Sequence, residues 1–207
     1  MLKGIDASFW QDIMDFKKAK SHGISFAFLR AQFGNSFDTR FRTNWILARD
    51  AGIFRGAYFF PIKSLSVIEQ TDRFLSVLKG LDFDIPPVID VEEYNNSTLS
   101  ASDVLFIINS IKKEFGVSPI IYTSNSMWKK VAGGDRTSFA DYPLWLAAWD
   151  APVDTLETPK PWTSWSFWQS QVISNGCYYG TSPYNTIDLN YFRGGEKELL
   201  SLSNKKA

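Results

Sequence analysis

Short apolar runs alternate with amphipathic segments along this chain, and the alternation limits the folds that it can adopt. The apolar runs predict eight β-strands, at residues 3–8, 25–31, 54–60, 86–92, 119–124, 144–149, 164–171 and 186–192. The segments between the earlier runs predict five helices, at residues 12–20, 41–51, 66–79, 100–115 and 125–131. Strands separated by helical patterns indicate βαβ units and a parallel sheet. Eight such strands allow the sheet to close into a barrel.

The last three predicted strands lack good helical connections, since the segment "DAPVDTLETPKPWT" (150–163) is rich in proline. We therefore expect an α/β fold with five βα units followed by three strands, which is an irregular TIM-like barrel. The length of 207 residues fits one domain. We assign residues 1–200 to a single barrel domain and expect the tail, 201–207, to be frayed.

Composition excludes several classes of function. The chain has 22 basic and 22 acidic residues, which argues against nucleic-acid binding and against a general attraction to acidic membranes. A single cysteine, Cys177, cannot form an internal disulfide. The one histidine, His22, precedes a glycine at the predicted end of a helix. A position in the last helical turn explains this histidine better than a catalytic role does. Carboxylates therefore remain as the acid–base groups, and we expect a monomer without cofactor.

Four acidic residues fall at the predicted strand ends. Asp6 lies at the end of the first strand, Asp90 and Glu92 at the end of the fourth, and Asp188 in the eighth. Side chains at positions i and i+2 of a strand share a face, so Asp90 and Glu92 point the same way. A closed barrel brings its first and eighth strands together, and function collects at one end of such barrels. The sequence therefore predicts a carboxylate cluster around one cleft.

Two chemistries fit such a cluster. Glycoside hydrolysis needs a protonated acid beside a charged carboxylate, and crowded like charges raise one pKa to supply that acid. The other chemistry is binding of Ca²⁺ or Mg²⁺ by oxygen ligands. A surplus of aromatic residues (8 Trp, 8 Tyr and 17 Phe) suits a groove that stacks on sugar rings and favours the first, with no metal site. Helix caps and salt bridges are the plain alternative for acids at these positions.

An ordered set of motifs resembles family 25 of the glycoside hydrolases, the Chalaropsis-type lysozymes of fungi, bacteria and phage endolysins. The matching stretches are "GIDASFWQ" (4–11), "FLRAQFGNSFDTRFRTNWILARDAGIFRGAYFF" (28–60), "PPVIDVE" (86–92), "PIIYTS" (119–124), "LWLAAW" (144–149), "FWQSQ" (167–171) and "IDLNYF" (187–192). Each stretch is weak alone, but together they span nearly the whole chain in the family's order.

The resemblance implies a flattened eight-stranded barrel and an N-acetylmuramidase. Such an enzyme hydrolyses the β-1,4 bond between N-acetylmuramic acid and N-acetylglucosamine in bacterial peptidoglycan. By resemblance, Glu92 is the proton donor. Asp90 is its partner, acting as nucleophile or orienting the N-acetyl group of the substrate. Asp6 and Asp188 shape the floor of the site and hold the charge state of the pair.

Four further positions match residues that line the family's groove, namely Tyr58, Tyr122, Trp149 and Gln169. The stretch "GAYFF" departs from the family's usual GAYHF, because Phe59 stands where a histidine is common. Phe59 cannot form a hydrogen bond, although neighbouring residues of a strand point to opposite faces and Tyr58 is retained.

Phe59 motivates one alternative function, a sugar-binding module on the same fold that has lost turnover. A second alternative is a chitinase-like glycosidase, although the longer acidic signature DxxDxDxE is absent from "PPVIDVE". The amino terminus "MLKGIDASFW" has no apolar run that would form a signal peptide. We therefore expect a phage endolysin that is released from the host cytoplasm to the wall, or a secreted protein whose signal was removed.

Overall fold

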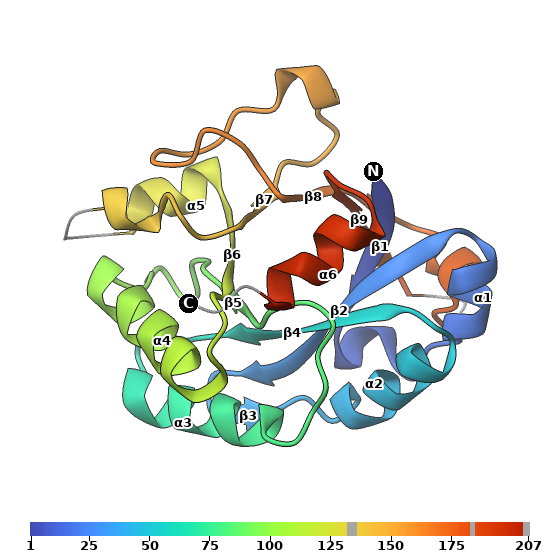
Figure 1. Cartoon of the computed structure of the whole chain (residues 1–207), viewed down its shortest axis with the longest axis horizontal. Coiled ribbons are helices and arrows are strands. Elements are labelled where there is room, and N and C mark those ends of the chain that lie inside the picture. The colour runs from blue at the N-terminus through green and yellow to red at the C-terminus, as the bar shows by residue number, and fades with distance from the viewer. Residues whose placement is uncertain (132–135, 183–184, 205–207) are drawn as a thin grey trace.

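Eight strands pair edge to edge into a closed barrel in the part of the chain that the structure describes (Figure 1). The computed structural model describes residues 1–131, 136–182 and 185–204. The barrel strands are β1 (Leu2–Ala7), β2 (Ile24–Phe33), β4 (Phe54–Phe60), β5 (Val88–Asp90), β6 (Ile120–Ser124), β7 (Leu144–Ala147), β8 (Phe167–Ile173) and β9 (Ile187–Phe192). This arrangement confirms the predicted α/β barrel of eight strands.

Most neighbouring strands of the barrel are parallel, but β9 is not. It lies between β8 and β1 and runs antiparallel to both. The pairing of β1 with β2 closes the ring, whose order is β1-β9-β8-β7-β6-β5-β4-β2. A short strand, β3 (Ser36–Phe37), extends β2 as an antiparallel hairpin. Because β9 is antiparallel, its amino-terminal end lies at the rim of the barrel where the parallel strands have their carboxyl-terminal ends.

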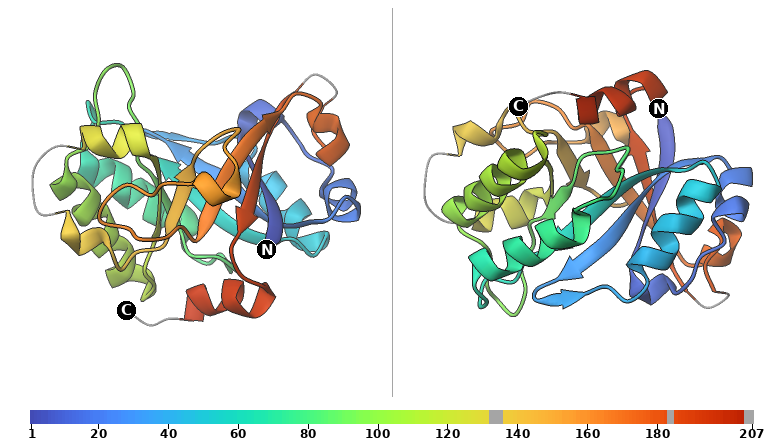
Figure 2. Two further views of the ribbon diagram at one scale, coloured as in Figure 1. Left: turned by 90° about the horizontal axis from the view of Figure 1, so that it is seen from above. Right: turned by 60° about the horizontal axis from the view of Figure 1, so that its bottom comes forward.

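Helices follow the early strands in the predicted order and lie outside the barrel (Figure 2). They are α1 (Phe16–Ser21), α2 (Phe41–Asp50), α3 (Val67–Leu78), α4 (Ala101–Phe115), α5 (Asn125–Lys130) and α6 (Glu196–Asn204). The longest, α4, begins at a capping box between Ser100 and Asp103 and ends at Gly116, whose φ of 68° favours glycine. No helix in the described ranges is long and apolar enough to cross a membrane.

The first helix is shorter than predicted. The expected helix spanned residues 12–20, whereas α1 begins at Phe16. Asp12 adopts a positive φ of 60°, which interrupts helical backbone, and Asp15 caps the helix by accepting a hydrogen bond from the Lys18 N–H (3.0 Å). The residues before it form a 3-10 turn, η1 (Phe9–Gln11), at the rim of the barrel.

Large aromatic rings fill the lower interior of the barrel. Phe26 and Phe28 are fully buried, and Phe28 stacks on Trp145 with 4.2 Å between ring centroids. A Cβ atom at Gly4 would lie 2.4 Å from the Phe26 ring, and one at Gly56 would lie 2.7 Å from Phe28. The two glycines therefore provide the space that these rings occupy, as small and large residues alternate inside a small barrel.

The C-terminal helix α6 was not predicted from the sequence. Leu199 of this helix is fully buried and packs against the interior cluster, together with Leu202. The Ser203 hydroxyl donates a hydrogen bond to the Asp84 carbonyl (2.7 Å). Residues 201–204 of the tail that we expected to be frayed are therefore helical, and residues 205–207 lie outside the described residues.

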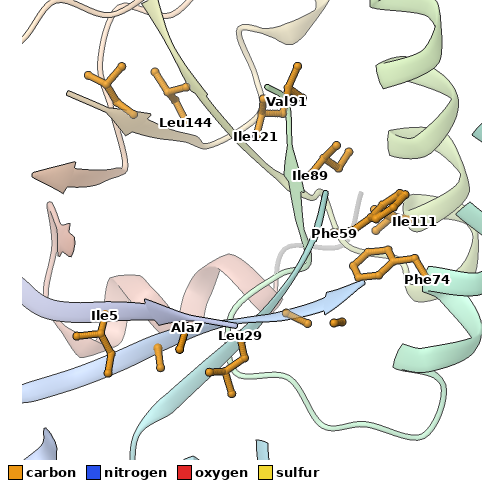
Figure 3. Packing of buried hydrophobic residues seen from close by; sticks show 14 of the residues in the cluster. Ile5, Ala7, Leu29, Phe59, Phe74, Ile89, Val91, Ile111, Ile121 and Leu144 are labelled. Carbon is orange, nitrogen blue, oxygen red and sulfur yellow. The ribbon is translucent and has the colours of Figure 1, made fainter. Parts of the chain in front are cut away.

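A second layer of core lies between the strands and the outer helices. Figure 3 shows Phe59 in this layer, where its ring stacks on Phe74 of α3 with 5.1 Å between centroids. Phe59 is fully buried, whereas Tyr58 points to the opposite face of β4, toward the barrel interior. The phenylalanine that departs from the family pattern is therefore a packing residue of the barrel exterior.

Replacing Phe59 by alanine should lower the free energy of unfolding by roughly 3–5 kcal/mol, because the cavity left between β4 and α3 cannot fully collapse. Denaturant unfolding measures this change, and Phe106→Ala, at an exposed position of α4, is the matched control. We expect the activity of the folded variant to match that of the wild type. A stable Phe59→Ala protein with impaired activity would instead make Phe59 part of the site.

Candidate active site

A cleft of about 290 Å³ opens at the rim of the barrel where the parallel strands end. All eight site residues predicted from the sequence line it: Asp6, Tyr58, Asp90, Glu92, Tyr122, Trp149, Gln169 and Asp188. They come from β1, β4, β5, β6, β8 and β9, and from the segments that follow β5 and β7. The fold therefore brings the predicted set together at one place.

The four acidic residues reach the cleft by different routes. Asp90 is the last residue of β5, and Glu92 follows two positions later on the same side. Asp6 lies near the end of β1. Asp188 lies near the start of β9, and it reaches the same rim because β9 runs antiparallel. Asp6 and Asp188 are direct partners in the β1–β9 register, as expected from barrel closure.

Asp6 is held by two side-chain amides. Its Oδ2 atom accepts hydrogen bonds from Gln169 Nε2 (2.9 Å) and from Asn190 Nδ2 (2.8 Å). Only 7% of Asp6 is exposed. Burial and the nearby Asp188 carboxylate raise the pKa of Asp6 well above its usual range, and the two amide donors partly oppose this rise.

Other polar hydrogens fix the orientation of both amides. Gln169 Oε1 accepts from the Tyr122 hydroxyl and from Trp149 Nε1, each at 2.8 Å. Asn190 Oδ1 accepts from Trp145 Nε1, also at 2.8 Å. Since an amide oxygen only accepts, these contacts leave the NH₂ group of each amide directed at Asp6. The cleft floor is thus a hydrogen-bonded network whose donors and acceptors are assigned by their partners.

Asp90 is buried but lacks part of its hydrogen bonding. Only 7% of the residue is exposed, and its Oδ1 atom has no hydrogen-bond partner among the residues that the structure describes. Burial raises the pKa of Asp90 well above its usual range. The Glu92 and Asp6 carboxylates raise it further, while the Arg30 guanidinium opposes them. A buried acceptor without a partner is costly unless a ligand supplies the missing donor.

The two remaining acids are less deeply buried. Burial and the Asp188 carboxylate raise the pKa of Glu92 above its ordinary value of 4.5. Burial raises the pKa of Asp188 from 3.8 to about 6. Four crowded carboxyl groups cannot all ionise near neutral pH, so the cluster retains protons. A protonated carboxylic acid beside carboxylates in a cleft is what acid-catalysed glycoside hydrolysis requires.

Divalent metal binding has no matching geometry here. Among residues 1–131, 136–182 and 185–204, no group of three or more His, Cys, Asp or Glu side chains is placed to hold a metal ion. The acids are instead interleaved with amide and hydroxyl donors from Gln169, Asn190 and Tyr122. Hydrogen-bond donors of neighbouring side chains, and not a cation, therefore accompany these carboxyl groups.

Aromatic side chains form the exposed walls of the cleft. Trp149 is 57% exposed and Trp10 is 67% exposed, and both line the cleft. Large apolar rings at an open cleft provide flat surfaces for the apolar faces of sugars. Burial beside the carboxylates raises the pKa values of Tyr58 and Tyr122 well above 10, so both keep their hydroxyl protons.

Sequence reasoning missed three residues of the site. Asn190 stands two positions after Asp188, and the i, i+2 rule would have placed it on the same face. Arg30 is a charged residue within an apolar strand, which is a signal of a buried ion partner. Trp145 lies in the apolar run 144–149, which predicts a strand and gives no signal of a polar role. It is indeed 2% exposed, but its indole N–H also serves the site.

Comparisons with known proteins agree with this geometry. The sequence profile described as Glycosyl hydrolases family 25 matches residues 5–175. The chain belongs to this family, and it is therefore a glycoside hydrolase of the lysozyme type.

Individual relatives cover most of the chain. It is 32% identical to Lysozyme M1 of Streptomyces globisporus over 219 residues, which covers 100% of this chain and 72% of that protein. It is 30% identical to an N,O-diacetylmuramidase of Arthroderma benhamiae, covering 82% of this chain and 76% of the relative. A solved bacterial lysozyme from Streptomyces coelicolor superimposes with a TM-score of 0.84 at 30% identity, covering 100% of this chain and 98% of that structure.

The raised pKa of Asp188 predicts how stability depends on pH. Between pH 3.8 and about 6 the folded protein binds more protons at this residue than the unfolded chain does. The associated stability is complete below pH 3.8 and is lost as pH rises through about 6. We expect the wild type to lose stability between about pH 4 and about pH 7, and Asp188→Asn to lose less.

Denaturant unfolding across this pH range measures the effect. Asp154→Asn, at an exposed position outside the cleft, is the control and should follow the wild type. Parallel pH profiles for the wild type and Asp188→Asn would contradict the assignment of a raised pKa to this residue.

Proposed function

We propose that this chain is an N-acetylmuramidase that hydrolyses the β-1,4 bond between N-acetylmuramic acid and N-acetylglucosamine in peptidoglycan. The observation that carries the proposal is the position of Glu92, a carboxyl group with a raised pKa in an open cleft beside three other acids. Two relatives, which match 100% and 82% of the chain, are named Lysozyme M1 and N,O-diacetylmuramidase. Membership of the family indicates that the bond cut is glycosidic, and the cleft contains carboxyl groups that can hydrolyse such a bond.

In the proposed reaction, Glu92 donates its proton to the glycosidic oxygen as the bond to the anomeric carbon breaks. Asp90 acts at the anomeric side, either as the nucleophile or through Oδ1, which can accept the N–H of the substrate's acetamido group. Water then completes hydrolysis, and its proton returns to Glu92. The Asp188 carboxylate raises the pKa of Glu92 and the Asp6 carboxylate raises that of Asp90, so these neighbours favour the protonated form of the pair.

The walls of the cleft fit a sugar polymer. Trp149 offers an exposed ring and is anchored through its indole N–H to Gln169, so its face is held at the mouth of the cleft. The proposal extends to lysis of the bacterial wall by a monomer, in the manner of a phage endolysin. The balanced charge of the chain supports a partner that is neither nucleic acid nor membrane.

A non-catalytic sugar-binding module is the main alternative. It was suggested by Phe59, which stands where the family usually has a histidine. In the structure Phe59 packs against α3 outside the barrel, so its lack of polar atoms does not alter the cleft. Nothing at the site favours the module, since all four acids face the cleft. The chitinase-like alternative has no specific observation in its favour.

Replacing Glu92 by glutamine should reduce hydrolysis of purified cell walls by about 100- to 10,000-fold while the protein remains folded, because the amide cannot donate the catalytic proton. A turbidity assay with circular dichroism as the folding check measures this. Glu93→Gln is the matched control, since Glu93 pairs with Lys130 and does not line the cleft. Full activity of Glu92→Gln would refute the assigned role.

Reduction of the released ends with borohydride, followed by mass spectrometry, identifies the bond that is cut. Muramitol ends from the wild type alone are the expected result. Glucosaminitol ends would move the cleavage to the other glycosidic bond, and release from chitin oligomers in preference to walls would favour the chitinase-like alternative. Wall binding without any new ends would favour the binding module.

A further inference from the structure

We propose that Arg30, held in place by Asp38, is a positioning residue that makes Asp90 the ionised member of the carboxylate cluster. This inference rests on the proposed function, in which Asp90 acts as a carboxylate while Glu92 acts as an acid. Among the described residues that line the cleft, Arg30 is the one basic side chain, and the same cleft holds four carboxyl groups. A single positive charge favours ionisation of the acid on which it acts most strongly.

The barrel places Arg30 on the interior face at the same rim as Asp90. Arg30 of β2 pairs with Tyr58 of β4 in the parallel register, and Tyr58 pairs with Val88 of β5. Asp90 stands two positions after Val88, so the side chains of these two residues share a face of the sheet. Arg30, Tyr58 and Asp90 all line the cleft. The guanidinium therefore lies on the cleft side of the sheet, with β4 between its own strand and that of Asp90.

Asp38 and two aromatic rings fix the position of the guanidinium. Asp38 Oδ2 lies 2.9 Å from Arg30 Nε, and the two side chains are 1% and 11% exposed. The Asp38 carboxylate also accepts the backbone N–H groups of Phe9 and Arg40, each at 2.9 Å. The ring centroids of Phe9 and Phe33 lie 5.2 and 5.5 Å from the Arg30 Cζ atom. These contacts hold the positive charge at one point of the cleft.

The other groups around Asp90 keep it protonated. They are Asp6 from β1, Tyr58 from β4, Tyr122 from β6, Asp188 from β9 and Glu92 after β5. Burial together with the Glu92 and Asp6 carboxylates raises the pKa of Asp90, and the Arg30 guanidinium opposes this rise. Asp6 has the amides of Gln169 and Asn190 to oppose the rise in its own pKa. For Asp90 the opposing group is the cation.

The proposed reaction requires opposite protonation states of Asp90 and Glu92. Glu92 must carry a proton for the leaving oxygen, while Asp90 must offer a lone pair to the anomeric carbon or to the acetamido N–H. Burial disfavours charge at both positions, and Asp90 is the more deeply buried of the two. Burial alone would therefore leave the proton on Asp90. Arg30 reverses this order because its positive charge stabilises the Asp90 carboxylate.

Replacing Arg30 by glutamine tests the proposal through the pH dependence of hydrolysis. With peptide-free glycan strands as the substrate, we expect kcat/KM to fall by roughly 10-fold at acidic pH and by less near neutral pH, because Asp90 then ionises only at a higher pH. Arg30→Lys keeps the charge and should retain the wild-type pH profile. Arg49→Gln is the matched control, since Arg49 also forms an ion pair but does not line the cleft.

A second variant keeps the test valid if Arg30→Gln fails to fold, since that change leaves the buried Asp38 carboxylate without its ion partner. The double variant Arg30→Gln/Asp38→Asn removes both charges and leaves two amides that can hydrogen-bond to each other. We expect it to fold and to show the same displaced pH profile. Losses that are equal at every pH for Arg30→Gln, Arg30→Lys and the double variant would overturn the proposal and make the ion pair a structural support of η1.

An NMR titration of the Asp90 carboxyl carbon separates this proposal from the proposed function, because it needs no turnover. The comparison uses Glu92→Gln and the double variant Glu92→Gln/Arg30→Gln, in which the coupling between Asp90 and Glu92 is absent. The Asp90→Asn spectrum assigns the signal. A higher pKa of Asp90 in the double variant would support the role of Arg30 even if the wild type cleaved no wall. The same pKa of Asp90 in both variants would overturn that role and leave the muramidase assignment intact.

Discussion

The pairing of Asp6 with Asp188 across β1 and β9 is the interaction on which the rest of the site depends. Like charges directly opposite in a strand pair destabilise the sheet. The protein accommodates this pair by burying Asp6 under two amide donors and by retaining protons in the surrounding cluster. A slip of one residue in the β1–β9 register would turn Asp188 away from the cleft, so the acidity of the site is tied to barrel closure.

The barrel interior divides into an apolar part and a polar part that support each other. Below the cleft, the rings of Phe26, Phe28 and Trp145 pack at close range. Trp145 also donates its indole N–H to Asn190, and through this contact the packed core sets the position of a donor to Asp6. The buried acids thus lie on a tightly packed core. This core holds the carboxyl groups in a strained arrangement that they would not keep without it.

Much of this structure could be predicted because local patterns agree with the fold. Apolar runs and glycine-terminated helices located the strands, and the strand-end acids together with the family motifs selected all eight predicted residues that line the cleft. The direction of β9 and the position of α6 could not be predicted, because both depend on contacts between distant segments. The orientation of Gln169 and Asn190 required the partners Tyr122, Trp149 and Trp145 in three dimensions.

Catalysis by Glu92 depends on burial and the nearby Asp188 carboxylate, which keep its carboxyl group protonated at pH values where an ordinary glutamate is ionised. A titration of side-chain carboxyl carbons by NMR, with Glu92 assigned through the Glu92→Gln spectrum, measures its pKa directly in the wild type and in Asp188→Asn. We expect a pKa above 4.5 in the wild type and a lower value in the variant, since burial and the Asp188 carboxylate cause the rise. An ordinary pKa for Glu92 that is the same in both proteins would contradict it.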